Sequence, residues 1–174
     1  MRVVMDIESN GLLNTANILW CAVAYDIDTH ATYEFILKDN EYDEFQTFMD
    51  NVDVWIGHNI IGYDIPLLSK LNVYQYTGAV CDTLIYSRTL DPDRALSEGC
   101  PTHIQDPITG KKKIVGSHSL EAWGYRVSRS KPYIERWDIW SDKILHRCKE
   151  DVIINYKTLQ MLLEEAELED IVTV

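Results

Sequence analysis

The sequence predicts an α/β domain built on one mixed sheet. Strand-like apolar segments at residues 2–12, 18–25 and 31–36 are separated by turn residues, a pattern typical of antiparallel strands. A helical spacing of apolar residues over 42–49 then precedes a short buried strand at 52–57. Because a strand–helix–strand order favours parallel pairing with the first strand, the sheet is expected to combine both kinds of pairing.

The rest of the chain is expected to form helices joined by irregular connections. Apolar positions at helical spacing from Ser141 to Leu163 predict a long amphipathic helix that packs on the sheet. Residues 91–117 and 132–140 are interrupted by proline and glycine or lack periodicity, so both are predicted to be loops. Shorter helices are expected to start near Asp64, at Asp82 or Thr83, and at Ser119, the last ending at Gly124.

The bulk composition is that of an ordinary globular protein. The 174 residues suit one domain with a core of its own, and 46% hydrophobic with 25% charged residues is typical of this class. No apolar run is long enough to span a bilayer and no signal peptide is apparent, so a cytoplasmic location is expected. The four cysteines are dispersed, which favours reduced thiols.

The formal net charge of -12 disfavours a protein that grips nucleic acid by broad electrostatics. It does not exclude a nucleic acid substrate, because carboxylates that hold divalent cations meet phosphate through the metal. An acidic protein-binding module is the alternative. The only dense basic run, Lys111, Lys112 and Lys113, is the expected phosphate-facing segment, with a solvated loop as the other interpretation.

Asp6 and Glu8 are the first candidate site residues. Side chains alternate along a strand, so these two acids share one face while Met5 and Ile7 point to the other. Like charges held side by side repel each other, and a cation between them relieves that repulsion. The pattern therefore predicts a metal site, with two unrelated acids at a solvated strand end as the alternative.

Asp64 is a third candidate acid. It lies in the first turn of an expected helix, directly after a strand that is expected to neighbour the first one. Open sheets bind ligands at the carboxyl ends of such strands, which favours a functional role. Stabilisation of the helix N-terminus by the carboxylate is the alternative.

Three short motifs together resemble a known family. They are Asp6-x-Glu8, Asn59-x-x-x-Tyr63-Asp64 and His146-x-x-x-x-Asp151, and in this order they are similar to the exonuclease motifs of the DEDD superfamily of 3′-5′ exonucleases. Residues 116–126, Gly-Ser-His-Ser-Leu-Glu-Ala-Trp-Gly-Tyr-Arg, are also similar to the proofreading domain at the front of DNA polymerases from short-tailed phages. The likeness runs over nearly the whole chain.

The resemblance implies an α/β, RNase H-like (DnaQ-like exonuclease) fold, with a mixed five-stranded sheet flanked by helices. It also implies two divalent cations, Mg²⁺ or Mn²⁺. Hard cations prefer oxygen ligands, and a pair of them supports an in-line displacement at phosphorus. The implied ligands, which are also the implied catalytic acids, are Asp6, Glu8, Asp64 and Asp151.

A general base completes the implied site. Family members carry either a tyrosine four residues before the last acid or a histidine five before it. Position 147 is Arg, which stays protonated, whereas His146 titrates in a useful range. His146 is therefore the expected base, in the histidine branch. Residues five apart on an unbroken helix diverge by about 140°, so this role requires the helix to begin or kink there.

The resemblance further implies contacts to a substrate strand. An unpaired terminal base suits the apolar contact that Leu12 offers. The segment Ser9, Asn10, Gly11 and Leu12 would meet the terminal nucleotide, and His58, Asn59, Tyr63 and His118 would line the same groove.

The expected function is removal of nucleoside 5′-monophosphates from the 3′ end of single-stranded DNA, within one exonuclease domain spanning residues 1–174. An exoribonuclease with the same site, or a non-catalytic accessory module of a polymerase, are the alternatives. A DNA polymerase or replication protein is a possible partner, as in proofreading, and no membrane partner is expected. The sequence does not distinguish a separate nuclease from one domain of a polymerase.

Overall fold

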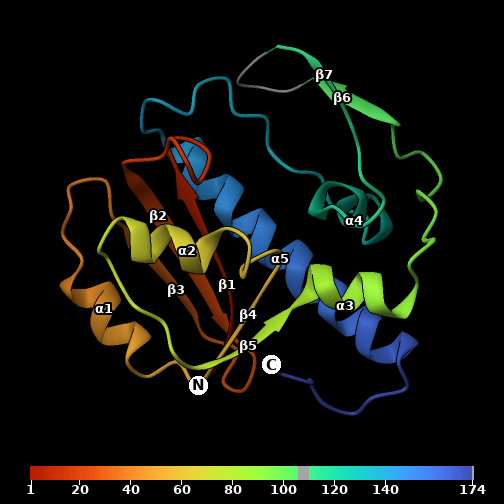
Figure 1. Cartoon of the computed structure of the whole chain (residues 1–174), viewed down its shortest axis with the longest axis horizontal. Helices are drawn as coiled ribbons and strands as arrows, with labels where there is room; N and C mark the ends of the chain where they lie inside the picture. The colour runs from red at the N-terminus through yellow and green to blue at the C-terminus, as the bar shows by residue number, and fades with distance from the viewer. Residues whose placement is uncertain (106–109, 174) are drawn as a thin grey trace.

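A five-stranded mixed sheet forms the centre of the computed structural model, which describes residues 1–105 and 110–173 (Figure 1). Its order is β3-β2-β1-β4-β5. β1 pairs antiparallel with β2 and parallel with β4, so the predicted RNase H-like sheet is confirmed. The strands are β1 (Arg2–Ser9), β2 (Leu19–Asp26), β3 (Thr32–Ile36), β4 (Val54–Gly57) and β5 (Ala79–Asp82).

Helices cover both faces of the sheet. The predicted long helix, α5 (Asp142–Glu165), runs along one face, while α1 and α2 lie on the other (Figure 1). Among the helices of the described residues, none is long and apolar enough to cross a membrane. The remaining helices are α1 (Asp43–Met49), α2 (Asp64–Lys70), α3 (Thr83–Leu90) and α4 (Leu120–Arg126).

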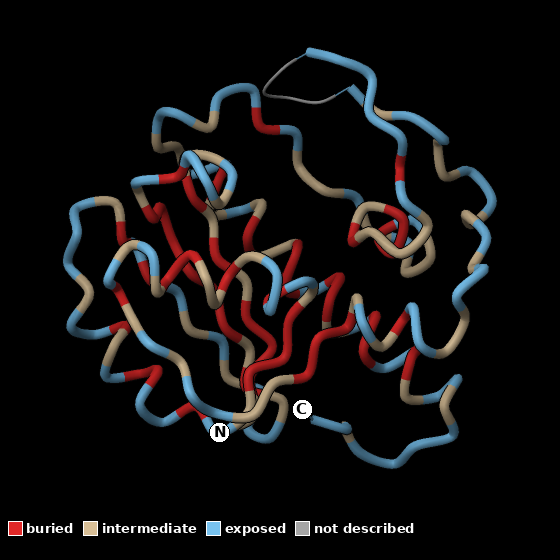
Figure 2. Tube along the Cα trace, viewed as in Figure 1, coloured by how far each residue is buried: buried red, intermediate tan, exposed pale blue. Residues whose placement is uncertain are grey.

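The alternation along β1 decides which side chains face α5. Val3, Met5 and Ile7 are buried in the cluster formed with α1 and α2. Val4 is buried in the other cluster, which includes the apolar side of α5, and the central strands are buried along much of their length (Figure 2). Asp6 and Glu8 share the face of Val4 and therefore continue the α5 side of the sheet toward its carboxyl end, as the sequence predicted.

Two strand regions were missed by the sequence analysis. β5 (Ala79–Asp82) precedes α3, where only a helix start was expected; the Asp82 side chain does cap α3, accepting from the Leu84 N–H at 3.0 Å. The expected loop 91–117 contains a hairpin of β6 (His103–Gln105) and β7 (Lys112–Ile114). Residues 106–109 of that predicted loop lie outside the described residues.

The prediction that the helix at Ser119 ends at Gly124 was wrong. α4 continues to Arg126. A Cβ at position 124 would lie 2.9 Å from the carbonyl oxygen of Arg129, and the Arg129 N–H donates to the Gly124 carbonyl at 2.8 Å. Gly124 therefore allows the following chain to pack closely against α4, and this glycine does not end the helix.

Candidate active site

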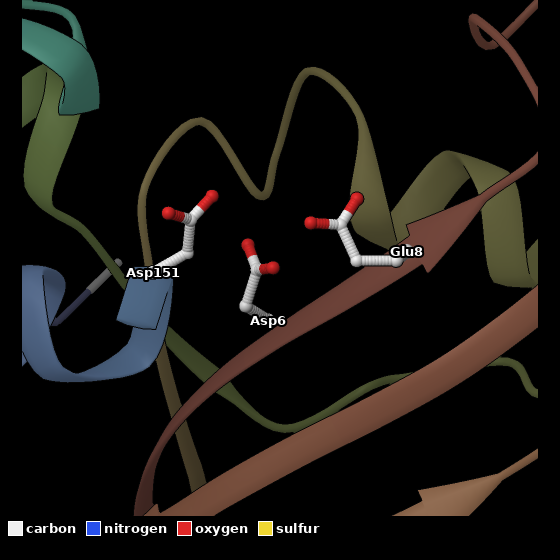
Figure 3. A group of neighbouring side chains, drawn as sticks. All are labelled: Asp6, Glu8 and Asp151. Carbon is white, nitrogen blue, oxygen red and sulfur yellow. The ribbon is translucent and has the colours of Figure 1, made fainter. Parts of the chain in front are cut away.

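Three carboxylates meet at the carboxyl end of β1. Asp6 and Glu8 extend from the strand and Asp151 extends toward them from α5 (Figure 3). One ligand oxygen from each lies within 4.8 Å of the other two. Residues from the first and third sequence motifs are thus brought into one cluster.

The packing of α5 against β1 creates this convergence. The Cys148 thiol, buried at the interface, donates to the Asp6 carbonyl oxygen at 3.2 Å. Residues three apart on a helix lie on the same face, so the contact made by Cys148 also brings Asp151 to the strand. A small apolar side chain at this point lets the helix approach closely enough for the acids to meet.

The cluster is electrostatically strained. Loss of solvation, followed by the charge of Asp151, raises the pKa of Asp6 to about 7. Burial and then the charge of Asp6 raise the pKa of Glu8 well above its ordinary value. Asp6 and Glu8 therefore resist ionisation beside each other, and a cation in the cluster would relieve the repulsion.

Asp151 has one oxygen satisfied and one without a partner. Its Oδ2 lies 2.7 Å from Lys131 Nζ and 3.1 Å from Arg147 Nε. Its Oδ1 is buried and has no hydrogen-bond partner among the described residues. A buried acceptor left open, within a set of carboxylate oxygens, fits the ligand preference of Mg²⁺ or Mn²⁺.

Asp64 is close to the cluster but is not part of its tightest group. It is buried in the first turn of α2, whose N-cap residue is Tyr63. Burial, then the charge of Asp6, raises the Asp64 pKa well above the ordinary value. The four predicted acids therefore share one electrostatic environment, in which Asp64 stands apart from the trio within 4.8 Å.

A loop beside the carboxylates is fixed by hydrogen bonds. The Tyr63 hydroxyl donates to the Gly11 carbonyl at 2.6 Å and lies 2.8 Å from Ser9 Oγ. Burial is the main cause that raises the Tyr63 pKa to about 12, so the phenol keeps its proton and remains a donor. Leu12 follows with 65% of its surface exposed. The second motif thus holds the turn that presents Leu12 to solvent.

Three of the predicted substrate residues, His58, Asn59 and His118, border a cavity of about 500 Å³ near α3. His58 Nδ1 lies 2.9 Å from Thr83 Oγ1, and burial, then the charge of Lys131, lowers the His58 pKa to about 3. His118 Nδ1 lies 2.9 Å from Ser87 Oγ. The cavity is lined by His58, Asn59, Leu84, Arg88, Gly116, Ser117, His118, Ser119 and Leu120.

His146 is not brought to the carboxylates. α5 runs without a break from Asp142 to Glu165, so the condition set by the sequence for a histidine base is not met. His146 is exposed and lines a separate hollow with Arg129 and Glu150. Arg147 occupies the face of Asp151 instead. The role of His146 as a base stays a prediction.

The predicted basic segment and Asn10 lie outside this cavity. Lys112 and Lys113 lie exposed on β7, directly after Lys111, in the hairpin seen beyond α4 in Figure 1. The Asn10 side-chain oxygen accepts from the backbone N–H groups of Asn17 and Ile18, at 3.0 and 3.1 Å. Asn10 therefore shapes its own loop.

Lys131 is a site residue that the sequence did not predict. This lysine lies in an irregular connection between α4 and α5, where no periodicity or motif marks it. Arg147 carried a detectable signal, because its spacing of four places it on the helix face of Asp151. Arg147 and Asp151 do form an ion pair along this face of the helix.

The chain is similar in sequence to two viral DNA polymerases. No protein-family model matches the chain. The DNA-directed DNA polymerase of Escherichia phage T7 is 26% identical over 200 residues, which cover 94% of this chain and 27% of the polymerase. The polymerase of Enterobacteria phage T3 is also 26% identical, over 205 residues. The chain thus spans about a quarter of the length of these relatives.

Solved structures share the fold at low sequence identity. Brucella melitensis NrnC bound to pGG has a TM-score of 0.62 at 14% identity, with 95% of this chain and 73% of that one covered. The Aedes aegypti Nibbler EXO domain has a TM-score of 0.57 at 11% identity, with 96% and 81% covered. The chain thus shares its fold with these two structures, and the predicted RNase H-like fold is confirmed.

Proposed function

We propose that this chain is a metal-dependent 3′-5′ exonuclease that shortens single-stranded DNA and releases nucleoside 5′-monophosphates. The observation that carries the proposal is the convergence of Asp6, Glu8 and Asp151 around a buried, unpartnered carboxylate oxygen. The similarity to two phage DNA polymerases favours DNA over RNA. Residues 1–174 would act as one domain in the host cytoplasm, in proofreading or a related replication task.

The carboxylates would hold two ions of Mg²⁺ or Mn²⁺, with Asp64 completing the set. When bound, such ions stabilise developing charge on phosphoryl oxygens and make water a stronger nucleophile at neutral pH. The protein gathers the acids before the metal arrives. It bears the cost of their repulsion in the folded state, as the raised pKa values of Asp6 and Glu8 indicate.

Substrate positioning would come from the loop beside β1 and the cavity near α3. Tyr63 fixes the Gly11 carbonyl, and Leu12 is left exposed to contact the terminal base. His58, neutral because its pKa is low, and His118 border the adjacent cavity. These groups suit an unpaired end, since stacking and apolar contacts act on single bases.

The reaction is hydrolysis of the terminal phosphodiester. Water adds to phosphorus, the bond to the 3′ oxygen of the penultimate nucleotide breaks, and that oxygen leaves as the new 3′-hydroxyl. Lys131 and Arg147 hold Asp151 in place during this displacement. The family resemblance assigns the general base to His146, but this exposed side chain borders a separate hollow, so the proposed displacement does not depend on it.

The test uses DNA and RNA oligonucleotides of one sequence, labelled at the 5′ end, with Mn²⁺ and either the protein or its Asp6→Ala variant. We expect a ladder of DNA products shortened from the 3′ end, with at least about a thousandfold slower cleavage by the variant. Preferred cleavage of RNA would show that the chain is an exoribonuclease. If neither substrate is cleaved, the non-catalytic accessory module is the remaining function. Equal cleavage by the variant would reveal a contaminating nuclease.

A further inference from the structure

Lys131 places a buried positive charge among the candidate metal ligands. Its ammonium lies 2.7 Å from Asp151 Oδ2, and only 10% of the side chain is exposed. The same charge offsets part of the rise in the Asp6 pKa that burial and Asp151 cause, and after burial it contributes to the lowered pKa of His58. Its field therefore reaches the β1 acid and the cavity as well as its ion-pair partner.

Arg147 is a second cation that pairs with Asp151. Arg147 Nε lies 3.1 Å from the same oxygen, Oδ2, and its Nη1 donates to the Pro132 carbonyl at 2.8 Å. The latter contact anchors the backbone next to Lys131. One guanidinium suffices to balance one carboxylate, so the charge of Lys131 is available to compensate the surplus negative charge at Asp6 as well.

A divalent cation would meet the same carboxylates from the open side of Asp151. The divalent cation would relieve the repulsion between the carboxylates, which is also what the Lys131 ammonium does. The ammonium and the divalent cation would in turn repel each other. Two cations that compete for the same carboxylates affect each other reciprocally. Metal binding weakens the Lys131–Asp151 ion pair, and that ion pair lowers the metal affinity by the same factor.

We propose that Lys131 is an internal counter-ion that competes with the divalent cation for the carboxylate cluster. The chain would thus bind metal more weakly than its carboxylates alone would allow. This inference rests on the metal site of the proposed function. It assigns Lys131 a role in setting metal affinity, in addition to positioning Asp151.

The experiment measures Mn²⁺ affinity without substrate, from the electron paramagnetic resonance signal of free Mn²⁺ titrated with the full chain. Lys131→Met removes the charge and keeps the length of the side chain, whereas Lys131→Arg keeps the charge. Lys157→Met, at an exposed position on α5, is the matched control. We expect Lys131→Met to bind Mn²⁺ about tenfold more tightly, and the other two variants to stay within about threefold of the unaltered protein.

Unchanged or weaker binding by Lys131→Met would overturn the proposal, because a lysine that only orients Asp151 should support metal binding. Lys131→Gln, with its fold checked by circular dichroism, must give the same sign. Asp6→Asn separates this failure from failure of the proposed function. If Asp6→Asn abolishes binding while Lys131→Met does not tighten it, the metal site stands and the competition does not. If neither the unaltered protein nor Lys131→Met binds Mn²⁺, both ideas are contradicted.

Discussion

Arg147 and Asp151 form an ion pair along one face of α5, with 3.1 Å between the arginine Nε and the aspartate Oδ2. The position four residues before the last acid therefore carries a permanent cation that cannot accept a proton at working pH. His146, one residue earlier, is exposed on another side of the helix. Neither Arg147 nor His146 is therefore placed to accept a proton beside Asp151.

The first prediction concerns His146. Because its side chain is remote from the carboxylate face of α5, His146→Ala is expected to slow DNA cleavage by less than about threefold, whereas a true general base contributes about 10²–10⁴-fold. Initial rates between pH 6 and 9 at saturating Mn²⁺ measure this. A hundredfold loss with a changed pH profile would restore the histidine assignment made from the sequence.

The second prediction concerns the stability provided by Arg147. Arg147→Met removes its contacts to Asp151 and to the Pro132 carbonyl, which should lower the free energy of unfolding by about 1–3 kcal/mol. Urea denaturation in metal-free buffer measures the change. Arg136→Met, which breaks an exposed pair with Asp138, serves as the control and should cost at most about 1 kcal/mol. Equal losses for both variants would contradict a special role for Arg147.

The third prediction concerns pH and metal-free stability. The Asp6 pKa is raised to about 7, so the folded state favours the protonated acid. Its stabilising contribution is complete below the unfolded pKa of about 4 and is lost as the pH rises through about 7. Glu8 and Asp64 shift in the same direction. The thermal midpoint of the unaltered protein in EDTA should therefore fall relative to that of Asp6→Asn between pH 4 and 8. Parallel curves would show that Asp6 carries no such strain.

The fourth prediction concerns the exposed leucine beside the carboxylates. If Leu12 contacts the terminal base, Leu12→Ala should raise the KM for single-stranded DNA by about tenfold, with little change in kcat. Leu168→Ala removes another exposed leucine and is expected to leave KM unchanged. Steady-state kinetics with a short oligonucleotide separate the two parameters. An equal KM for both variants would remove Leu12 from the binding surface.

Much of the fold could be predicted from local patterns. The alternation in β1 and the long apolar stripe of α5 are strong periodic signals, and both are confirmed. β5 was missed because it has only four residues, and Asp82 gave a clear capping signal for the following helix. Gly124 was misread since the close approach of Arg129 is a tertiary contact without local signature.

The part of the site that depends on residue spacing along one strand could be predicted. Asp6 and Glu8 follow from strand alternation, and their approach to Asp151 was implied by family resemblance rather than by periodicity. Lys131 was not predictable, because its place depends on how an irregular connection folds back onto α5 through Arg147 and Pro132. Contacts that long-range packing creates leave no pattern in a single sequence.

Under the proposed function, distant segments of the chain together enclose a divalent cation. Anomalous diffraction from crystals of the full chain soaked in MnCl₂ tests it most directly. We expect a manganese peak bounded by the carboxylates of Asp6, Glu8 and Asp151. Ordered carboxylates with no peak among them, or an Asp151 turned away from β1, would contradict it.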